Sequence, residues 1–200
     1  FSFLETSALS NAEQINFFFF FSDTGVKLST VCSYYQILSD TLIGDLLPAF
    51  EKTKKRKAMT TAKFYFFDCG VTNYLLGRKD LAEGTPEYGK ALEQAIYTEI
   101  KAYISYNQLD YKFEYWRSTS LFEVDFLLYN SLKNIIAIET KAGTNPSKKD
   151  YKGFLALEED FPLKRKIVVC RAPSPRLTND DIEILPVHLF LEELWEGKII

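Results

Sequence analysis

The stretch FEVDFLLYNSLKNIIAIETKA, residues 122–142, places four charged side chains inside two apolar runs that are otherwise typical of buried β-strands. Glu123 and Asp125 are two residues apart in the first run, and Glu139 and Lys141 are two residues apart in the second. Side chains two positions apart on a strand point to the same face of a sheet. The polar residues between the runs predict a hairpin loop, which would bring the two charged pairs together.

The predicted hairpin register decides which charges meet. If Tyr129 pairs with Ile135, Asp125 falls opposite Glu139. Two like charges at that spacing repel unless a proton or a cation lies between them, and a divalent metal ion is the natural candidate. The alternative is structural: Glu123 and Lys141, also opposite each other in this register, form an ion pair on a solvated sheet edge beside exposed carboxylates.

Composition limits the classes of function. The 200 residues are 46% hydrophobic and 16% aromatic, which suffices for one large domain or two small ones. The three scattered cysteines are typical of reduced thiols in a cytoplasmic protein. The single histidine has no basic or nucleophilic neighbour in the sequence, so a core or capping role is expected for it.

The basic residues form two local clusters. The net charge of −3 means that any nucleic-acid contact must come from such patches. The residues expected to bind nucleic acid are Lys54, Lys55 and Arg56 in the first cluster and Lys148, Lys149 and Lys152 in the second. The alternative for each cluster is a solvated loop or helix face.

Residues 1–70 have the pattern of a winged helix. The segments 11–20 and 28–42 are predicted helices separated by a turn, with Asn11 as the N-cap of the first. Two strand-like runs, LLPAF and KFYFFD, follow on either side of the basic loop, which would be the wing. The second helix carries no lysine or arginine, so packing against another domain is favoured over reading DNA.

Residues 71–87 are a predicted connector, and residues 88–200 a predicted second domain. The sequence GTPEYGKA at the boundary nearly matches a phosphate-binding loop, but Ala91 lacks the hydroxyl that holds magnesium and Pro86 lacks a donor, so no ATP site is expected. The helix predicted over Tyr88–Tyr106 carries two acids, Glu93 and Glu99, either of which is placed to turn inward. Helices and strands then alternate, which predicts an α/β fold with a mixed sheet flanked by helices.

The start of the chain predicts a missing neighbour. Residue 1 is phenylalanine and the only methionine is Met59, so we expect these residues to be the later part of a longer polypeptide. Phe17–Phe21 are five consecutive phenylalanines, too few to span a membrane. They cover every direction of a helix, so part of this surface is expected to be exposed or covered by another domain.

The helix acid, the V-D-F strand and the I-E-T-K strand resemble the PD-(D/E)xK, restriction-endonuclease-like superfamily. Nearly the whole chain, from STVCSYYQILSDTL to ILPVHLFLEELWEGKII, resembles the C-terminal region of a family of prokaryotic AAA-type ATPases. The resemblance implies Asp125 and Glu139 as ligands of Mg²⁺ or Mn²⁺, Lys141 as catalytic lysine and Glu93 as the acid of the first helix. It also implies an ATPase module earlier in the same polypeptide.

Two functions therefore remain open at this point. The first is a metal-dependent nuclease domain attached to an ATPase. Its expected substrate is nucleic acid, with DNA favoured over RNA. The second is a non-catalytic module that packs on the ATPase and binds nucleic acid or protein. In both interpretations the protein is cytoplasmic and needs no membrane.

Overall fold

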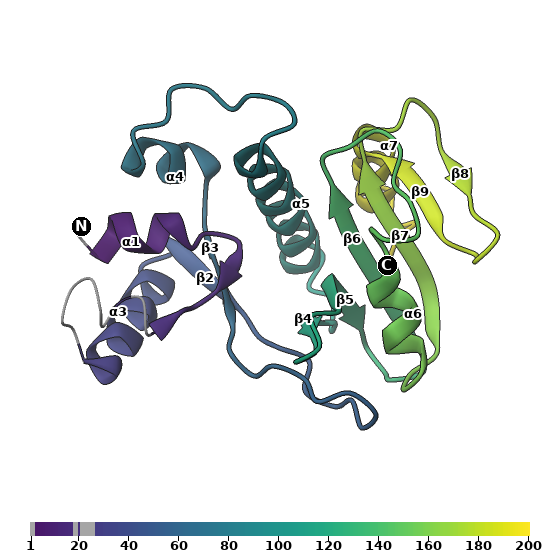
Figure 1. Cartoon of the computed structure of the whole chain (residues 1–200), viewed down its shortest axis with the longest axis horizontal. Helices are drawn as coiled ribbons and strands as arrows, with labels where there is room; N and C mark the ends of the chain where they lie inside the picture. Colours follow the sequence, from purple (N-terminus) through teal and green to yellow (C-terminus); the bar gives the residue numbers. More distant parts are fainter. Residues whose placement is uncertain (1–2, 18–19, 21–26) are drawn as a thin grey trace. The chain divides into compact units, whose positions relative to one another are not determined.

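The structure is a computed structural model that describes residues 3–17, 20 and 27–200. Two compact units, each with its own sheet, make up the chain (Figure 1). The first unit comprises Phe1–Leu47 and Thr61–Ala95, and the second comprises Pro48–Thr60 and Ile96–Ile200. The predicted α/β class is confirmed, because both units combine helices with a sheet and the larger sheet mixes parallel and antiparallel strands.

The first unit packs helices against a small antiparallel sheet in the order β1-β3-β2. Its described elements are α1 (Phe3–Leu9), β1 (Glu13–Gln14), α3 (Leu28–Asp40), β2 (Gly44–Leu47), β3 (Lys63–Phe66), α4 (Cys69–Leu75) and the start of α5 (Pro86–Tyr106). Its core is aromatic: the Tyr35 ring of α3 meets the Phe64 ring of β3 edge-on at 4.8 Å between centroids. Edge-on pairs of this kind are a favourable arrangement of two aromatic quadrupoles.

The predicted helix over residues 11–20 is wrong at its start. Residues 13 and 14 form strand β1, which pairs with β3. Asn11 does not cap a helix, because its side-chain oxygen accepts from the backbone N–H of Phe66 at 2.9 Å and its amide donates to Gln94 at 2.8 Å. A local capping signal was overridden by a buried contact with residues far along the chain.

The phenylalanine run at residues 17–21 is only partly described. Phe20 is fully buried in the core of the first unit, and Phe17 packs against the same core. Phe18, Phe19 and Phe21 lie outside the described residues, so the expected exposed patch stays a prediction.

The second unit is built on a mixed sheet in the order β4-β5-β6-β7-β9-β8. Its strands are β4 (Lys112–Arg117), β5 (Glu123–Tyr129), β6 (Ile135–Lys141), β7 (Leu163–Cys170), β8 (Arg176–Leu177) and β9 (Glu183–Pro186), and its helices, besides the end of α5, are α6 (Lys152–Glu158) and α7 (Val187–Trp195). Strands β4, β5 and β6 form an antiparallel meander, while β6, β7 and β9 are parallel. Parallel neighbours need a crossover, and α6 supplies it between β6 and β7.

Helices α6 and α7 cover opposite faces of this sheet (Figure 1). On the α6 face, Phe154 and Leu157 pack with Val124, Leu127 and Val168 in one buried cluster. On the other face, the Phe126 ring lies 5.6 Å from the ring of Phe113 and 6.2 Å from that of Tyr97, between centroids. The charged stretch of β5 and β6 therefore lies in strands that are buried on both sides.

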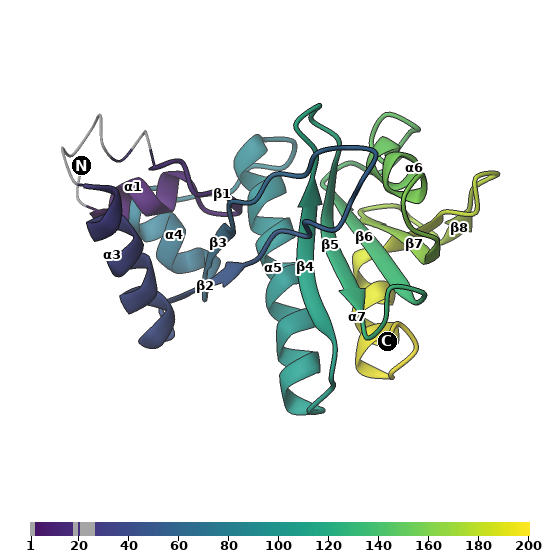
Figure 2. The same ribbon diagram turned by 90° about the horizontal axis from the view of Figure 1, so that it is seen from below.

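The segment Pro48–Thr60, called the strap below, runs along the outer edge of β4 and on toward α6 (Figure 2). Phe50 donates its N–H to the Tyr115 carbonyl at 2.7 Å, and Tyr115 donates to the Pro48 carbonyl at 3.0 Å. The Phe50 ring is fully buried and meets the rings of Tyr129 and Phe161. The strap therefore covers an edge strand that would otherwise present unpaired backbone groups.

The strap changes two of the predictions. The basic loop predicted as a wing on the first domain is part of the second unit, because its apolar residue Phe50 is anchored in that core. The predicted boundaries at 1–70, 71–87 and 88–200 also differ from the observed division, since residues 71–95 belong with the first unit. The division falls inside α5, between Ala95 and Ile96.

Candidate functional site

A bulge in β5 shapes the candidate site. Between Leu127, opposite Glu114, and Val124, opposite Trp116, strand β5 has one residue more than β4. Both Leu127 and Val124 point into the α6-side cluster. The two residues between them, Asp125 and Phe126, therefore share the other face of the sheet, as two residues opposite one partner do in a bulge.

Asp125 is held by hydrogen bonds from Thr140 of the neighbouring strand β6. Its side chain is 5% exposed, and Oδ2 accepts from the backbone N–H of Thr140 at 2.8 Å and from Thr140 Oγ1 at 2.9 Å. The carboxylate replaces a backbone carbonyl as the acceptor at the point where the β5–β6 ladder ends. These two hydrogen bonds satisfy the buried Oδ2 atom of Asp125 and fix the orientation of its carboxylate.

Glu139 lies on β6 beside Lys141. It is 6% exposed; Oε1 accepts from Lys141 Nζ at 2.5 Å, and Oε2 accepts from the backbone N–H of Asp125 at 3.4 Å. Burial, and next the nearby charge of Asp125, raise the pKa of Glu139 well above its ordinary value, although Lys141 acts in the opposite direction. The site therefore holds a carboxyl whose ionisation the fold disfavours.

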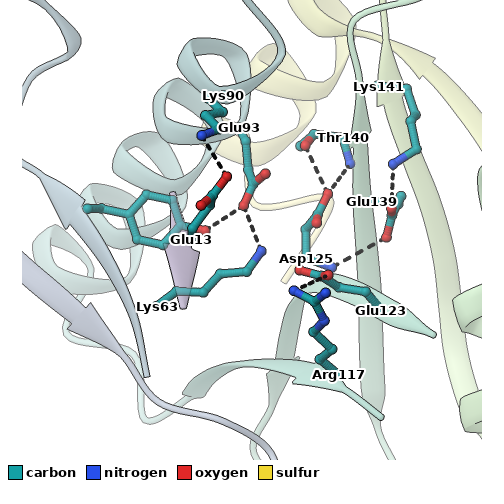
Figure 3. A network of polar contacts seen from close by, with 11 residues as sticks. Glu13, Lys63, Lys90, Glu93, Arg117, Glu123, Asp125, Glu139, Thr140 and Lys141 are labelled. Carbon is teal, nitrogen blue, oxygen red and sulfur yellow. Dashed lines mark hydrogen bonds and ion pairs between the residues drawn. The ribbon is translucent and has the colours of Figure 1, made fainter. Parts of the chain in front are cut away.

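The predicted register is confirmed, but its consequence for the two carboxylates is wrong. Phe126 pairs with Ile138, which is the register expected from pairing Tyr129 with Ile135. The bulge then turns Asp125 to the face that carries Thr140, while Glu139 and Lys141 lie on the other side of β6 (Figure 3). The Glu139 carboxylate thus contacts the backbone N–H of Asp125 at the edge of the strand, and the two carboxylates do not face each other on one side of the sheet.

Each residue of the alternative ion pair, Glu123 and Lys141, has a different charged residue close to it. Glu123 approaches Arg117 of β4 at 3.5 Å, whereas Lys141 approaches Glu139. Asp125 and Glu139 are buried, contrary to the exposed positions that this alternative expects. The charged stretch is therefore a buried polar centre in the second unit.

The two acids of α5 have separate roles. Glu93 belongs to the first unit, where Oε1 accepts from Lys63 Nζ at 2.9 Å and from the Tyr65 hydroxyl at 2.6 Å. Glu99 belongs to the second unit and accepts from Trp195 Nε1 of α7 at 2.7 Å. The structure brings Asp125, Glu139 and Lys141 together within one unit, whereas Glu93 is part of a partly buried network in the other.

The predicted nucleic-acid-binding residues all belong to the second unit. Lys54, Lys55 and Arg56 lie at the tip of the strap, and Lys152 begins α6. Lys149 is exposed, and Lys148 forms an ion pair with Asp180 at 2.9 Å. The two clusters, about ninety residues apart in sequence, therefore share one compact unit.

Two hydrogen-bonding or pairing roles in the centre were not predicted from the sequence. Thr140 supplies both donors to Asp125, and Tyr115 lies opposite the bulge that turns Asp125. The signal for Tyr115 was present in YKFEYWRS, an aromatic-rich run typical of a strand. Thr140 stands between Glu139 and Lys141, and its bonding to Asp125 depends on the bulge, which its own position in the sequence does not indicate.

Metal-binding clusters and membrane-spanning helices are both absent from the described part of the chain. Within residues 3–17, 20 and 27–200, no group of three or more His, Cys, Asp or Glu residues is placed to hold a metal ion. None of the helices described there combines the length and the apolar character that crossing a bilayer requires.

His188, for which a core or capping role was expected, is exposed on α7.

Comparison with known proteins matches the two parts of the chain to two families. The model described as Domain of unknown function (DUF8612) matches residues 2–82, and the model described as Domain of unknown function (DUF4143) matches residues 88–190, just over half of the chain. Domains of the second family are found at the C-terminus of AAA-type ATPases, which agrees with the resemblance in the sequence. No curated protein and no solved structure matches the chain. The chain therefore belongs to the family Domain of unknown function (DUF4143).

Proposed function

We propose that the second unit is a nuclease-like domain of the PD-(D/E)xK type, which hydrolyses phosphodiester bonds of nucleic acid with Mg²⁺ or Mn²⁺. The observation that carries the proposal is a buried centre in which the Glu139 carboxylate accepts from the backbone N–H of Asp125 and from Lys141, with the Asp125 carboxylate buried on the neighbouring strand. Burying two carboxylates is costly unless a charged partner offsets them, so such centres are concentrated at functional sites.

The donor set fits a hard divalent cation. Carboxylate oxygens are the ligands that Mg²⁺ and Mn²⁺ prefer, and those of Asp125 and Glu139 would hold the ion. The raised pKa of Glu139 is an electrostatic cost that a dication beside it would remove. A bound ion supplies a water of lowered pKa and neutralises charge on the phosphate.

The residues of the chain would contribute position and charge. Thr140 fixes the orientation of Asp125 through two hydrogen bonds. Lys141 is half-buried with its ammonium group at Glu139, and in the reaction it would stabilise negative charge on the phosphate oxygens. Because Lys141 is bonded to Glu139, we expect it to turn from Glu139 to the substrate when a metal ion binds.

The setting that we propose is the C-terminal part of a AAA-type ATPase. The family to which the chain belongs supports this setting, and so does the order of elements in the first unit. There α1, β1 and α3 precede the antiparallel pair β2–β3, and the sheet order is β1-β3-β2, as in a winged helix. The partner would be an ATPase module in the same polypeptide.

A specific observation favours a second candidate, a non-catalytic module that packs on protein. Helix α3, at the place of a recognition helix, carries no lysine or arginine and exposes Leu28 and Ile37, which are 57% and 54% accessible. An apolar surface of this kind suits a protein interface better than a phosphate backbone. It belongs to the first unit and is compatible with catalysis in the second.

Cleavage of plasmid, linear and single-stranded DNA in millimolar Mg²⁺ or Mn²⁺ tests the proposal. We expect cleavage by the protein as it stands and loss of at least a hundredfold in rate in Lys141→Ala, because the lysine acts on charge that develops in the transition state. EDTA should abolish it. Cleavage that persists unchanged in Lys141→Ala would show a contaminating nuclease and reject the assignment.

Thermal unfolding tests the metal site without turnover. Millimolar Mn²⁺ should raise the melting temperature, because a ligand at about a hundred times its Kd stabilises a fold by about 2.7 kcal/mol. Asp125→Asn should abolish the shift, while Lys112→Ala on β4 should keep it. A wild-type protein that melts normally with no response to Mn²⁺ leaves the non-catalytic module as the function.

A further inference from the structure

The tip of the strap and the start of α6 present cations from two distant parts of the sequence on one unit. We infer that these residues form a single surface that binds the phosphodiester backbone of nucleic acid. The inference rests on the proposed function and identifies where its substrate is held. It also assigns the contact to the sheet-containing second unit and not to the first, where the basic loop was expected to be a wing.

The strap tip is fixed by contacts with the body of the unit. The Asp160 carboxylate accepts from the backbone N–H groups of Lys54 and Lys55 at 3.2 and 3.1 Å. Thr53 Oγ1 donates to the Arg56 carbonyl at 2.8 Å, closing the tip as a turn. Because the backbone carries these contacts, the side chains of Lys54 and Lys55 remain exposed to solvent.

Phe122, at the end of the β4–β5 hairpin, joins the two basic segments. The Arg56 guanidinium lies 4.7 Å from the centre of its ring, and the Lys152 ammonium lies 5.3 Å from the same centre. Both distances are within the range of cation–π attraction. The ring, itself packed against the buried α6-side cluster, therefore positions one cation from the strap and one from α6.

The charge balance of this surface favours a polyanion. Arg56 is paired with Glu159, so the balance is that of three lysines, Lys54, Lys55 and Lys152, against the one carboxylate of Asp160. Lys54, Lys55 and Lys152 are exposed. Cations spread along a surface and not gathered in a pocket match the regularly spaced phosphates of a nucleic-acid strand better than a single small anion.

The surface also adjoins the proposed catalytic strand. Phe122 immediately precedes β5, three residues before Asp125. Helix α6 packs against β5 so closely that the backbone carbonyl of Glu123 lies where a side chain of Gly153 would begin. A nucleic-acid strand held at Arg56 and Lys152 would thus lie beside Phe122, at the end of β5 that leads to Asp125.

Binding in EDTA separates this inference from catalysis. The probe is a fluorescein-labelled DNA duplex of mixed sequence, and its anisotropy is measured with the whole chain at about 50–200 mM NaCl. In Lys55→Ala/Lys152→Ala we expect at least tenfold weaker binding, and a slope of log Kd against log salt lower by about 2, because each phosphate contact contributes about 0.9. Phe122→Leu keeps every charge, so it should weaken binding severalfold at an unchanged slope.

The matched control is Lys112→Ala/Lys133→Ala, which removes the same charge. Lys112 pairs with Tyr129 at the far end of the hairpin, and Lys133 lies in the turn that follows that end. The control should bind as the wild type does. Three results would overturn the inference. The first is an equal loss of binding in both double variants, and the second is that poly-glutamate binds as tightly as DNA does. The third is that the wild type binds neither duplex nor single-stranded DNA or RNA. Intact binding with no cleavage would instead contradict only the proposed function.

Discussion

Glu139 is a carboxyl that the fold removes from water and also places near a second carboxylate. Burial and Asp125 together raise the pKa of Glu139, although Lys141 donates to it at 2.5 Å. A group whose pKa is higher in the folded than in the unfolded protein binds more protons when folded. Its contribution to stability is therefore full below the unfolded pKa and is lost as pH rises through the folded pKa.

The first prediction concerns this pH dependence. In metal-free protein, the wild type should lose unfolding free energy as pH rises above about 4.5, the ordinary pKa of the group. Glu139→Gln should flatten that loss and be as stable as the wild type or more so at about pH 8. Denaturant unfolding from about pH 4.5 to about pH 9 measures it, with Glu192→Gln, an exposed acid of α7, as control. A wild-type and Glu139→Gln pair with parallel pH profiles would contradict the raised pKa.

The identity of the charged residues was the part of the site that the sequence predicted best. Charged positions inside the apolar runs of β5 and β6 already marked Asp125, Glu139 and Lys141, because buried charge is rare. Their orientation was not predictable from alternation alone. One extra residue in β5 changes the face of Asp125, and that bulge depends on its pairing with β4, which no local pattern in β5 indicates.

At the scale of elements, the strap is bonded to β4, and β4 in turn pairs with β5. Tyr115 of β4 is bonded through both its N–H and its carbonyl to the strap, and it lies opposite the bulge that orients Asp125. The geometry of the candidate centre therefore depends on a segment that joins it from more than sixty residues earlier in the chain. Such long-range dependence is outside what local patterns report.

The packing of α6 on β5 gives the second prediction. A Cβ at Gly153 would overlap the backbone carbonyl of Glu123, and backbone cannot move aside as a flexible side chain does. Gly153→Ala should therefore destabilise the protein by about 1–3 kcal/mol, the usual cost of overpacking, despite the better helix propensity of alanine. Gly89→Ala on α5 is the control, since nothing lies within 4 Å of its added carbon. Equal melting temperatures for both variants would refute the close contact.

At the scale of the whole molecule, the chain passes between the two units three times, after Leu47, Thr60 and Ala95. Linear boundaries inferred from composition cannot represent such a division, which is why the predicted 88–200 domain omits the strap. The family match over residues 88–190 omits it as well. A fragment cut at the predicted boundary would therefore lack both Phe50 and the partner of the β4 edge.

The last prediction follows from that omission. The fragment 88–200 should aggregate or melt without cooperativity, because it exposes a strand edge and an apolar site left by Phe50. Loss of a buried phenylalanine side chain alone costs about 3–5 kcal/mol, a large part of the roughly 5–15 kcal/mol typical of a domain. Size-exclusion chromatography and circular dichroism melts measure both effects. Adding a peptide of residues 48–60 in trans should restore a cooperative melt, and the same peptide with Phe50→Ala should not. A fragment 88–200 that is monomeric and melts at the temperature of the whole chain would show that the strap is dispensable, and would remove its role in orienting Asp125.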